Sequence, residues 1–250
     1  MKYRLSLMLL WALGAAALAA PVQAAAPAET GRIRVLLTYG GHGFEEQPFF
    51  AMFDALPGVV YAKAQMPQDA GLLKPGLEKQ YDVIVRYDMV AAVTPEQQKA
   101  FVDLLKTGIG LVSLHHNMGA HRDWDEYPKI IGGRFFVQEG QIGGQKYGKS
   151  GWRDGQDHNV TVVDKEHPIT KGVQDFKIHD EAYNKYYVAP NVKVLLKSDC
   201  PSNDPSIAWV TEYGKSRVCY LMLGHDHLAW DNPSYKQILG NAIKWACAKE

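Results

Sequence analysis

Short apolar runs alternate with amphipathic segments through the first half of the chain. Apolar side chains recur at helical spacing in Glu45–Leu56 and in the segment that begins at Thr94 and ends at Gly108. The short runs beside these segments are predicted strands; they are Arg32–Tyr39, Val59–Ala64, Tyr81–Tyr87 and Gly110–His115. The last of them is apolar on both faces, as in parallel strands covered by helices. This alternation predicts an α/β domain with a doubly wound, mostly parallel sheet flanked by helices.

The second half of the chain is richer in predicted strands. After a short predicted helix over Trp124–Ile131, residues 134–160 are rich in Gly, Gln, Lys and Trp and predict an excursion over the surface. The predicted strands that follow are His158–Val163, Val192–Lys197, Ile207–Glu212 and Arg217–Leu223. A helix over Tyr235–Ala246 closes the chain. Residues 32–250 are therefore expected to form a single domain with a β-rich C-terminal half.

The first residues have the pattern of a secretory signal peptide. Lys2 and Arg4 precede the apolar run Leu5–Ala20, and Val22-Gln23-Ala24 has the small residues of a cleavage site. We expect a signal peptide over residues 1–24, a short linker over 25–31 and a periplasmic or secreted mature protein. A retained anchor is the alternative, but the run is short for a span of about 20 residues, so no stable membrane anchor is expected after cleavage.

Charge and cysteine content narrow the function classes. The 27 basic and 27 acidic residues are scattered, whereas nucleic-acid binding would require a basic stripe. Three cysteines without a Cys-x-x-Cys pattern do not suggest a structural zinc cluster. Cys219 and Cys247 fall in a predicted strand and helix, and Cys200 is the one expected to be exposed. No nucleotide-binding pattern is evident, so no nucleotide cofactor is expected.

Histidines follow three of the apolar runs, each beside glycine or asparagine. They are His42 after Gly41, His115 before His116 and Asn117, and His225 after Gly224. In parallel α/β sheets ligands bind at the carboxyl ends of the strands, where the loops converge. Imidazole transfers protons near neutral pH and binds metals. These positions predict one pocket that contains all three imidazoles.

Covalent catalysis is not expected at this pocket. The strand that ends at His115 has no Ser or Cys nucleophile at its end, and Ser113 lies inside the strand. Because neighbouring side chains of a strand face opposite ways, His115 and His116 should not share a pocket if both keep strand geometry.

Carboxylates occur in two further motifs. Asp180, Glu181 and Tyr183 lie close together, and Glu181 and Tyr183 share a face if the segment is extended. Asp226 lies between His225 and His227 and could fix an imidazole tautomer. A solvated acidic loop and exposed histidines are the alternatives for these motifs. Hydrolysis by two carboxylates would need a second one about 5–9.5 Å from the first, and the sequence identifies none across a pocket.

In combination these motifs resemble the ThuA-like family, named for trehalose utilisation, whose fold is similar to class I glutamine amidotransferases. The resemblance is carried by Gly110–His116, Asp180-Glu181-x-Tyr183, the turn His167–Gly172 and Gly224-His225-Asp226, and it extends from about Arg32 to Trp245. In the amidotransferases a Cys ends the fourth strand; because His115 lies near that position, glutaminase activity is not expected.

The resemblance implies a role in the metabolism of a small saccharide or keto-sugar. Carried over residue by residue, it implies a site of His42, His115, Glu181 and His225, supported by Asp180, Tyr183 and Asp226. We expect His115, Glu181 and His225 to be catalytic, and the substrate-binding residues to be His42, Asn117, Tyr183, Asp226 and Trp124.

Two functions from different classes fit these residues. The first is a lyase, isomerase or hydrolase that uses His and Glu for acid–base chemistry. One divalent Zn, Mn, Ni or Fe ion held by His42, His115, Glu181 and His225 could assist it. The second is a non-catalytic saccharide-binding protein, favoured by the missing nucleophile and by aromatic residues in and near the excursion, among them Trp124, Tyr147 and Trp152.

Overall fold

A single nine-stranded sheet runs through the molecule. The computed structural model describes residues 31–247, and the strand order of the sheet is β2-β1-β3-β4-β13-β12-β11-β8-β9. The first five strands are mutually parallel: β2 (Val59–Gln65), β1 (Ile33–Gly40), β3 (Val83–Asp88), β4 (Gly110–Leu114) and β13 (Ser216–Leu221). The sheet then continues in antiparallel strands: β12 (Ser206–Tyr213), β11 (Lys193–Ser198), β8 (Gly151–Val162) and β9 (Phe176–Asn184).

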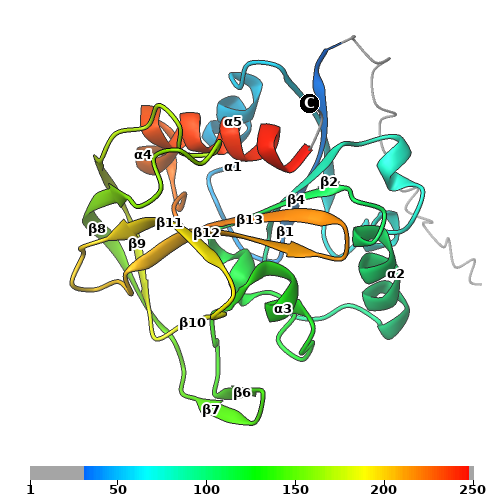
Figure 1. Ribbon diagram of the computed structural model, residues 1–250. Coiled ribbons are helices and arrows are strands. Elements are labelled where there is room, and N and C mark those ends of the chain that lie inside the picture. The colour runs from blue at the N-terminus through cyan, green and yellow to red at the C-terminus, as the bar shows by residue number, and fades with distance from the viewer. Residues whose placement is uncertain (1–30, 248–250) are drawn as a thin grey trace, which may run out of the picture.

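Helices cover both faces of this sheet, as Figure 1 shows with α5 above the strands and α3 below them. The helices are α1 (Glu46–Asp54), α2 (Pro95–Leu105), α3 (Tyr127–Ile131), α4 (His227–Trp230) and α5 (Pro233–Cys247). Thr94 caps α2 by accepting a hydrogen bond from Gln97 N at 3.3 Å, and Pro95 begins the helix. The predicted α/β fold with a β-rich C-terminal half is confirmed.

The predicted excursion contains more regular structure than the sequence suggested. Strands β6 (Gly140–Ile142) and β7 (Gln145–Tyr147) form a hairpin that projects from the body in Figure 1. The first half of β8 also lies in the excursion, and β9 pairs with it. A small second sheet joins β5 (Gly133–Arg134) to β10 (Tyr187–Val188). The sequence did not predict β9 as a strand, because its residues, including His179, Asp180 and Glu181, are largely polar.

Three short 3₁₀ helices lie in the connections of the parallel strands in the described part of the chain, two between β2 and β3 and one after β4. They are η1 (Ala70–Leu72), η2 (Leu77–Lys79) and η3 (His115–Gly119). The last of these directly continues β4, so the chain turns sharply at His115.

The expectation about Cys200 is wrong, and the predicted signal peptide cannot be compared with the structure. Cys200 was expected to be exposed, but it is buried, because its loop folds onto Ser198 and its backbone N–H donates to Ser198 Oγ at 3.1 Å. The predicted signal peptide over residues 1–24 lies outside the described residues, and so does most of the predicted linker over 25–31. Within residues 31–247, no helix combines the length and the apolar character that crossing a membrane requires.

Candidate functional site

The three strand-end histidines lie at the same edge of the sheet. His42 follows β1, His115 follows β4 and His225 follows β13, and these strands belong to the parallel half of the sheet. The ring centroids of His115 and His225 are 5.3 Å apart. His42 lies further out and stacks on His116 at 4.7 Å. The parallel strand order therefore brings together residues that are far apart in sequence.

Backbone geometry at His115 determines which histidines enter the site. His115 has a left-handed φ of 47°, which ends β4 and begins η3. The alternation of a regular strand is thereby broken, and both His115 and His116 turn toward the same region, with ring centroids 5.3 Å apart. His116 Nε2 contacts Tyr87 O at 2.9 Å. The expectation that only one of the two faces the pocket was conditional on strand geometry, and that condition is not met.

His115 Nε2 has three polar neighbours. Glu181 Oε2 lies at 3.1 Å, His225 Nδ1 at 3.2 Å and Tyr183 Oη at 3.0 Å. The other ring nitrogen, Nδ1, donates to Met222 O at 2.7 Å, which fixes the ring orientation. One ring nitrogen can make only one hydrogen bond through its single proton or lone pair. Three polar atoms therefore surround Nε2, although this nitrogen can form a hydrogen bond with only one of them.

Strand β9 supplies the acidic side of the site. Glu181 and Tyr183 are two residues apart in this strand, so their side chains point to the same face, as expected for an extended segment. Asp180 points the other way and is fully buried, where it accepts hydrogen bonds from Gly224 N at 2.7 Å and His225 N at 3.0 Å. Asp180 thus fastens the loop that carries His225 to the strand that carries Glu181.

Electrostatics couple His115 to Glu181. Burial disfavours the charged form of each, but their hydrogen bond and opposite charges outweigh it, so the pKa of His115 is raised and that of Glu181 is lowered. Burial lowers the pKa of His116 well below its usual value, and the neighbouring His115 and His42 lower it further. Burial also raises the pKa of Tyr183 well above its usual range, which keeps the phenol protonated as a donor.

The loop between β13 and α4 is held by close packing. Gly224 has a φ of 114°, and a Cβ at this position would lie 2.4 Å from Tyr235 Oη. Tyr87 Oη donates to Gly224 O at 3.1 Å, and Trp230 Nε1 donates to the same oxygen at 2.9 Å. This loop therefore requires glycine, and its conformation determines where the His225 ring lies.

A cavity of about 410 Å³ opens beside Glu181, Tyr183 and His225. His42 and His225 line it, whereas His115 is fully buried behind Glu181 and His225, so only two of the three strand-end imidazoles line the cavity. We call it the histidine cavity; its lining residues are His42, Met89, His116, Phe135, Val137, Lys149, Trp152, Asp154, Glu181, Tyr183 and His225. Its volume falls in the range of small-molecule sites, about 300–1,000 Å³. Aromatic and apolar faces beside several ionisable groups suit a ring that carries hydroxyl groups.

The sequence pointed to part of the cavity wall only through the aromatic side chain of Trp152, and it did not identify Lys149 or Asp154. Lys149, Trp152 and Asp154 lie in the predicted excursion, and Trp152 is 63% exposed at the cavity. Asp154 lies where β8 loses register with β9, and its Oδ1 is 3.8 Å from His225 Nε2. Bulges of this kind redirect side chains next to sites. In the sequence, only the aromatic residues of the excursion indicated that this segment could contribute to a binding site.

Three of the residues expected to bind substrate do not line this cavity. Asn117 is buried behind it, where its amide donates to Asp88 O and its carbonyl accepts from Ser113 Oγ. Asp226 caps α4 by accepting from Leu228 N at 2.9 Å. Trp124 stacks on Tyr127 at 5.7 Å. The sequence places all three beside functional residues, but their side chains have structural partners elsewhere.

Three donor atoms form a group that could hold a metal ion: His115 Nε2, His225 Nδ1 and Glu181 Oε2. Their separations are 3.1, 3.2 and 3.5 Å. Ligands on a tetrahedral ion with bonds of about 2.0–2.2 Å are about 3.3–3.6 Å apart, so only small shifts are needed. His42, the fourth expected ligand, is outside this group and contacts Gly43 O through Nδ1 at 2.7 Å.

Solved structures with the same fold come from several bacteria. A putative ThuA-like protein from Parabacteroides merdae matches with a TM-score of 0.70 and 17% identity over 87% of this chain and 90% of its own. One from Bacteroides uniformis matches with a TM-score of 0.66 and 23% identity over 90% and 96%. A cytoplasmic protein from Salmonella typhimurium matches with a TM-score of 0.59 and 13% identity over 86% and 99%. At these identities the likeness shows the fold alone.

The sequence itself shows the family. No curated protein matches the chain. The ThuA family model, described as trehalose utilisation, matches residues 35–246, which include every residue of the histidine cavity. That description supports a carbohydrate-related role, and the chain belongs to the ThuA family.

Proposed function

We propose that this protein is a saccharide-processing enzyme in which His115, Glu181 and His225 hold one divalent cation beneath a saccharide or keto-glycoside. The observation that carries the proposal is the cluster of three donor atoms, each within 3.5 Å of the other two, beside the histidine cavity. The family description supports the substrate class.

The donor set suits a borderline transition metal. Two imidazoles and one carboxylate are typical ligands of Zn, Mn, Ni and Fe, and such sites leave positions open for substrate oxygens. The hydrogen bond from His115 Nδ1 to Met222 O is the outer contact expected of a ligating histidine. Asp154 lies on the Nε2 side of His225, where it could accept the proton of that ring.

Proton transfer falls to groups that are not needed as ligands. A cation in this position would bind a substrate carbonyl and acidify the neighbouring C–H group. His42 borders the cavity, and because its Nδ1 donates to Gly43 O, its Nε2 is free to accept that proton. Enolisation of this kind supports isomerisation, epimerisation or β-elimination. Trp152 offers a flat face for the sugar ring.

The proposal predicts that loss of a metal ligand impairs both metal binding and turnover, whereas loss of the base impairs turnover alone. His115→Ala and Glu181→Gln should each lower the affinity for Zn²⁺ by at least about 10- to 100-fold, because loss of even an outer contact to a ligand has an effect of that size. Both variants should also abolish turnover. His42→Gln should keep the metal and lower turnover by about 100-fold or more, because only the base is lost. Elemental analysis measures the metal, and NMR follows trehalose and its oxidised keto derivatives.

His227→Gln is the matched control, because His227 is exposed, contacts Glu45 and does not line the cavity. It should change neither quantity. Unchanged turnover in His115→Ala and Glu181→Gln would contradict the proposal. Trehalose binding in calorimetry without turnover, undisturbed by a chelator, would instead favour the non-catalytic saccharide-binding protein.

We also propose that the protein acts outside the cytoplasm. The proposal rests on the N-terminal sequence alone, in which a basic start, an apolar run and small residues before Ala25 follow the secretory pattern. The saccharide would then be periplasmic or extracellular.

A further inference from the structure

A second cavity of about 310 Å³ adjoins the histidine cavity. We call it the loop cavity, because the segments 122–128 and 134–142 form its walls. Phe135 and Val137 line both cavities. The Phe135 ring also packs on Tyr183 at 4.9 Å, so one aromatic wall connects the candidate site to the loop cavity.

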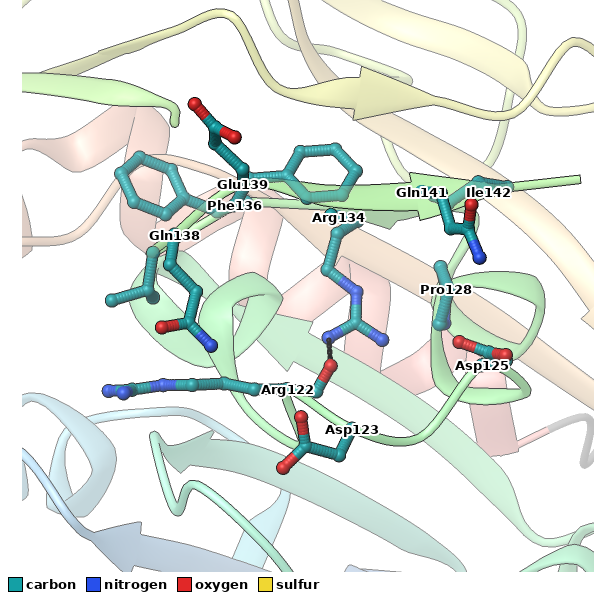
Figure 2. A pocket seen from close by; sticks show the side chains of 13 residues that line it. Arg122, Asp123, Asp125, Pro128, Arg134, Phe136, Gln138, Glu139, Gln141 and Ile142 are labelled. Carbon is teal, nitrogen blue, oxygen red and sulfur yellow. Dashed lines mark hydrogen bonds between the residues drawn. The ribbon is translucent and has the colours of Figure 1, made fainter. Parts of the chain in front are cut away.

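Arg134 builds this second cavity. Its guanidinium donates to His121 O at 3.0 Å, Arg122 O at 3.3 Å and Trp124 O at 2.8 Å. These bonds fix the backbone of the loop, while the Arg122 and Asp123 side chains remain exposed. Figure 2 shows the guanidinium of Arg134 pointing between Asp123 and Asp125. The cavity is therefore shaped by a buried side chain.

Charged groups of both signs line the loop cavity without pairing with each other. Arg122 and Arg134 face the same space as Asp123, Asp125 and Glu139, and no ion pair joins these five in the described part of the chain. Burial lowers the pKa of Arg134, and the charges of Asp125 and Asp123 counteract this effect. The guanidinium of Arg134 is occupied by backbone carbonyls, whereas the side chains of Arg122, Asp123, Asp125 and Glu139 are available to a ligand.

The mixture of charges selects the ligand class. An anion would be repelled by the three carboxylates, and a cation by the two guanidinium groups. A hydroxyl group can donate to a carboxylate and accept from a guanidinium at the same time. A neutral ligand with several hydroxyl groups is therefore the one that both kinds of side chain can bind.

We propose that the loop cavity is a second saccharide subsite, which binds the sugar next to the one in the histidine cavity. The substrate would then be a disaccharide or longer glycoside that crosses the wall formed by Phe135 and Val137. This inference rests on the proposed function, since it requires a sugar in the histidine cavity.

Binding of trehalose and of methyl α-D-glucopyranoside tests the subsite, because the second ligand supplies one ring only. Both should bind the wild-type chain in calorimetry. Asp123→Asn combined with Asp125→Asn should weaken trehalose binding at least tenfold, since bonds to charged groups are lost, and leave the single-ring ligand within about twofold. Asp103→Asn, on the exposed face of α2 and outside both cavities, is the matched control and should change neither affinity.

The outcomes distinguish the two proposals. Trehalose affinity that is unchanged in the double variant, while the wild type binds both sugars, would overturn the subsite and leave the proposed function intact. Equal weakening of both ligands in the double variant would also overturn it, because the effect would not be confined to the second ring. If neither sugar binds the wild type, the proposed function fails and the subsite fails with it.

Discussion

At the end of β4, the left-handed backbone of His115 brings two consecutive imidazoles to one side of the sheet. Their surroundings then separate their roles. His115 lies beside Glu181, which favours its charged form, whereas His116 is buried beside two other histidines, which favour its neutral form. Identical side chains at adjacent positions thus acquire opposite protonation preferences because their neighbours differ.

A third histidine, His121, gives a prediction at the residue scale. Its Nε2 accepts a hydrogen bond from Arg86 at 2.9 Å, and burial together with the Arg86 charge lowers its pKa to about 3. In the unfolded chain the pKa of His121 is near 6.5, about the ordinary value for histidine. The unfolded state therefore binds more protons than the folded state below about pH 6.5, and the free energy of unfolding falls as the pH decreases. The loss attributable to His121 between pH 7.5 and pH 5 is about 2 kcal/mol.

Urea denaturation at both pH values measures this loss. In His121→Asn, which tolerates the residue's φ of 51°, the decrease in unfolding free energy should be about 2 kcal/mol smaller than in the wild type. The exposed His227→Gln control should show a decrease at least as large as the wild type, because Glu45 raises the pKa of His227 and so favours the folded state at low pH. An equal decrease in His121→Asn and the wild type would show that His121 does not titrate in this way.

At the scale of elements, the site depends on how β9 and the β13–α4 loop are joined. Asp180 satisfies two backbone N–H groups of that loop, while Tyr87 and Trp230 bind its carbonyl at Gly224. These contacts hold Glu181 and His225 at a fixed separation, although Glu181 lies on β9 and His225 in the β13–α4 loop. A small change in the loop should therefore be felt directly at the donor cluster.

Gly224→Ala should disturb the loop more than a matched glycine substitution. Gly76 has a similar φ of 107° but open space around it, whereas a Cβ at Gly224 lies 2.4 Å from Tyr235 Oη. We expect Gly76→Ala to cost about 1–2 kcal/mol from backbone strain. Gly224→Ala should cost about 1–3 kcal/mol more from overpacking. Thermal and urea denaturation measure both.

Tyr235→Phe provides a second variant for this test. Among the described residues Tyr235 Oη has no hydrogen-bond partner, so its removal should cost little. In combination with Gly224→Ala it should recover part of the lost stability, because the closest contact disappears. If the effects of Gly224→Ala and Tyr235→Phe on the free energy of unfolding were simply additive, the double-mutant cycle would refute a clash between the Cβ at position 224 and Tyr235 Oη.

At the scale of the whole molecule, the parallel half of the sheet provides the histidines and the antiparallel half provides Glu181, Tyr183 and the outer wall of the cavity. Neither half contains the site alone. The cavity lies where the carboxyl ends of parallel strands meet the β8–β9 pair. Sites at such edges agree with the general rule for open α/β sheets.

Export is the prediction that concerns the whole chain. If residues 1–24 are a cleaved signal peptide, expression of the full sequence in a bacterial host should yield a mature protein that begins at Ala25 and fractionates with the periplasm. N-terminal sequencing of the purified protein measures this. A protein that keeps Met1 or remains in the cytoplasmic fraction would contradict it.

The α/β class, the position of most strands and the three strand-end histidines could be predicted from the amino-acid sequence, because apolar periodicity and strand-end position are local properties. It could not determine that His116 enters the site, since that depends on a single backbone angle. Nor could it identify Lys149 and Asp154 as cavity residues, or show that Asn117, Asp226 and Trp124 lie away from the cavity, since the lining of a cavity depends on which strands pair. Side-chain convergence comes from the order of strands in the sheet, and only the tertiary structure decides that order.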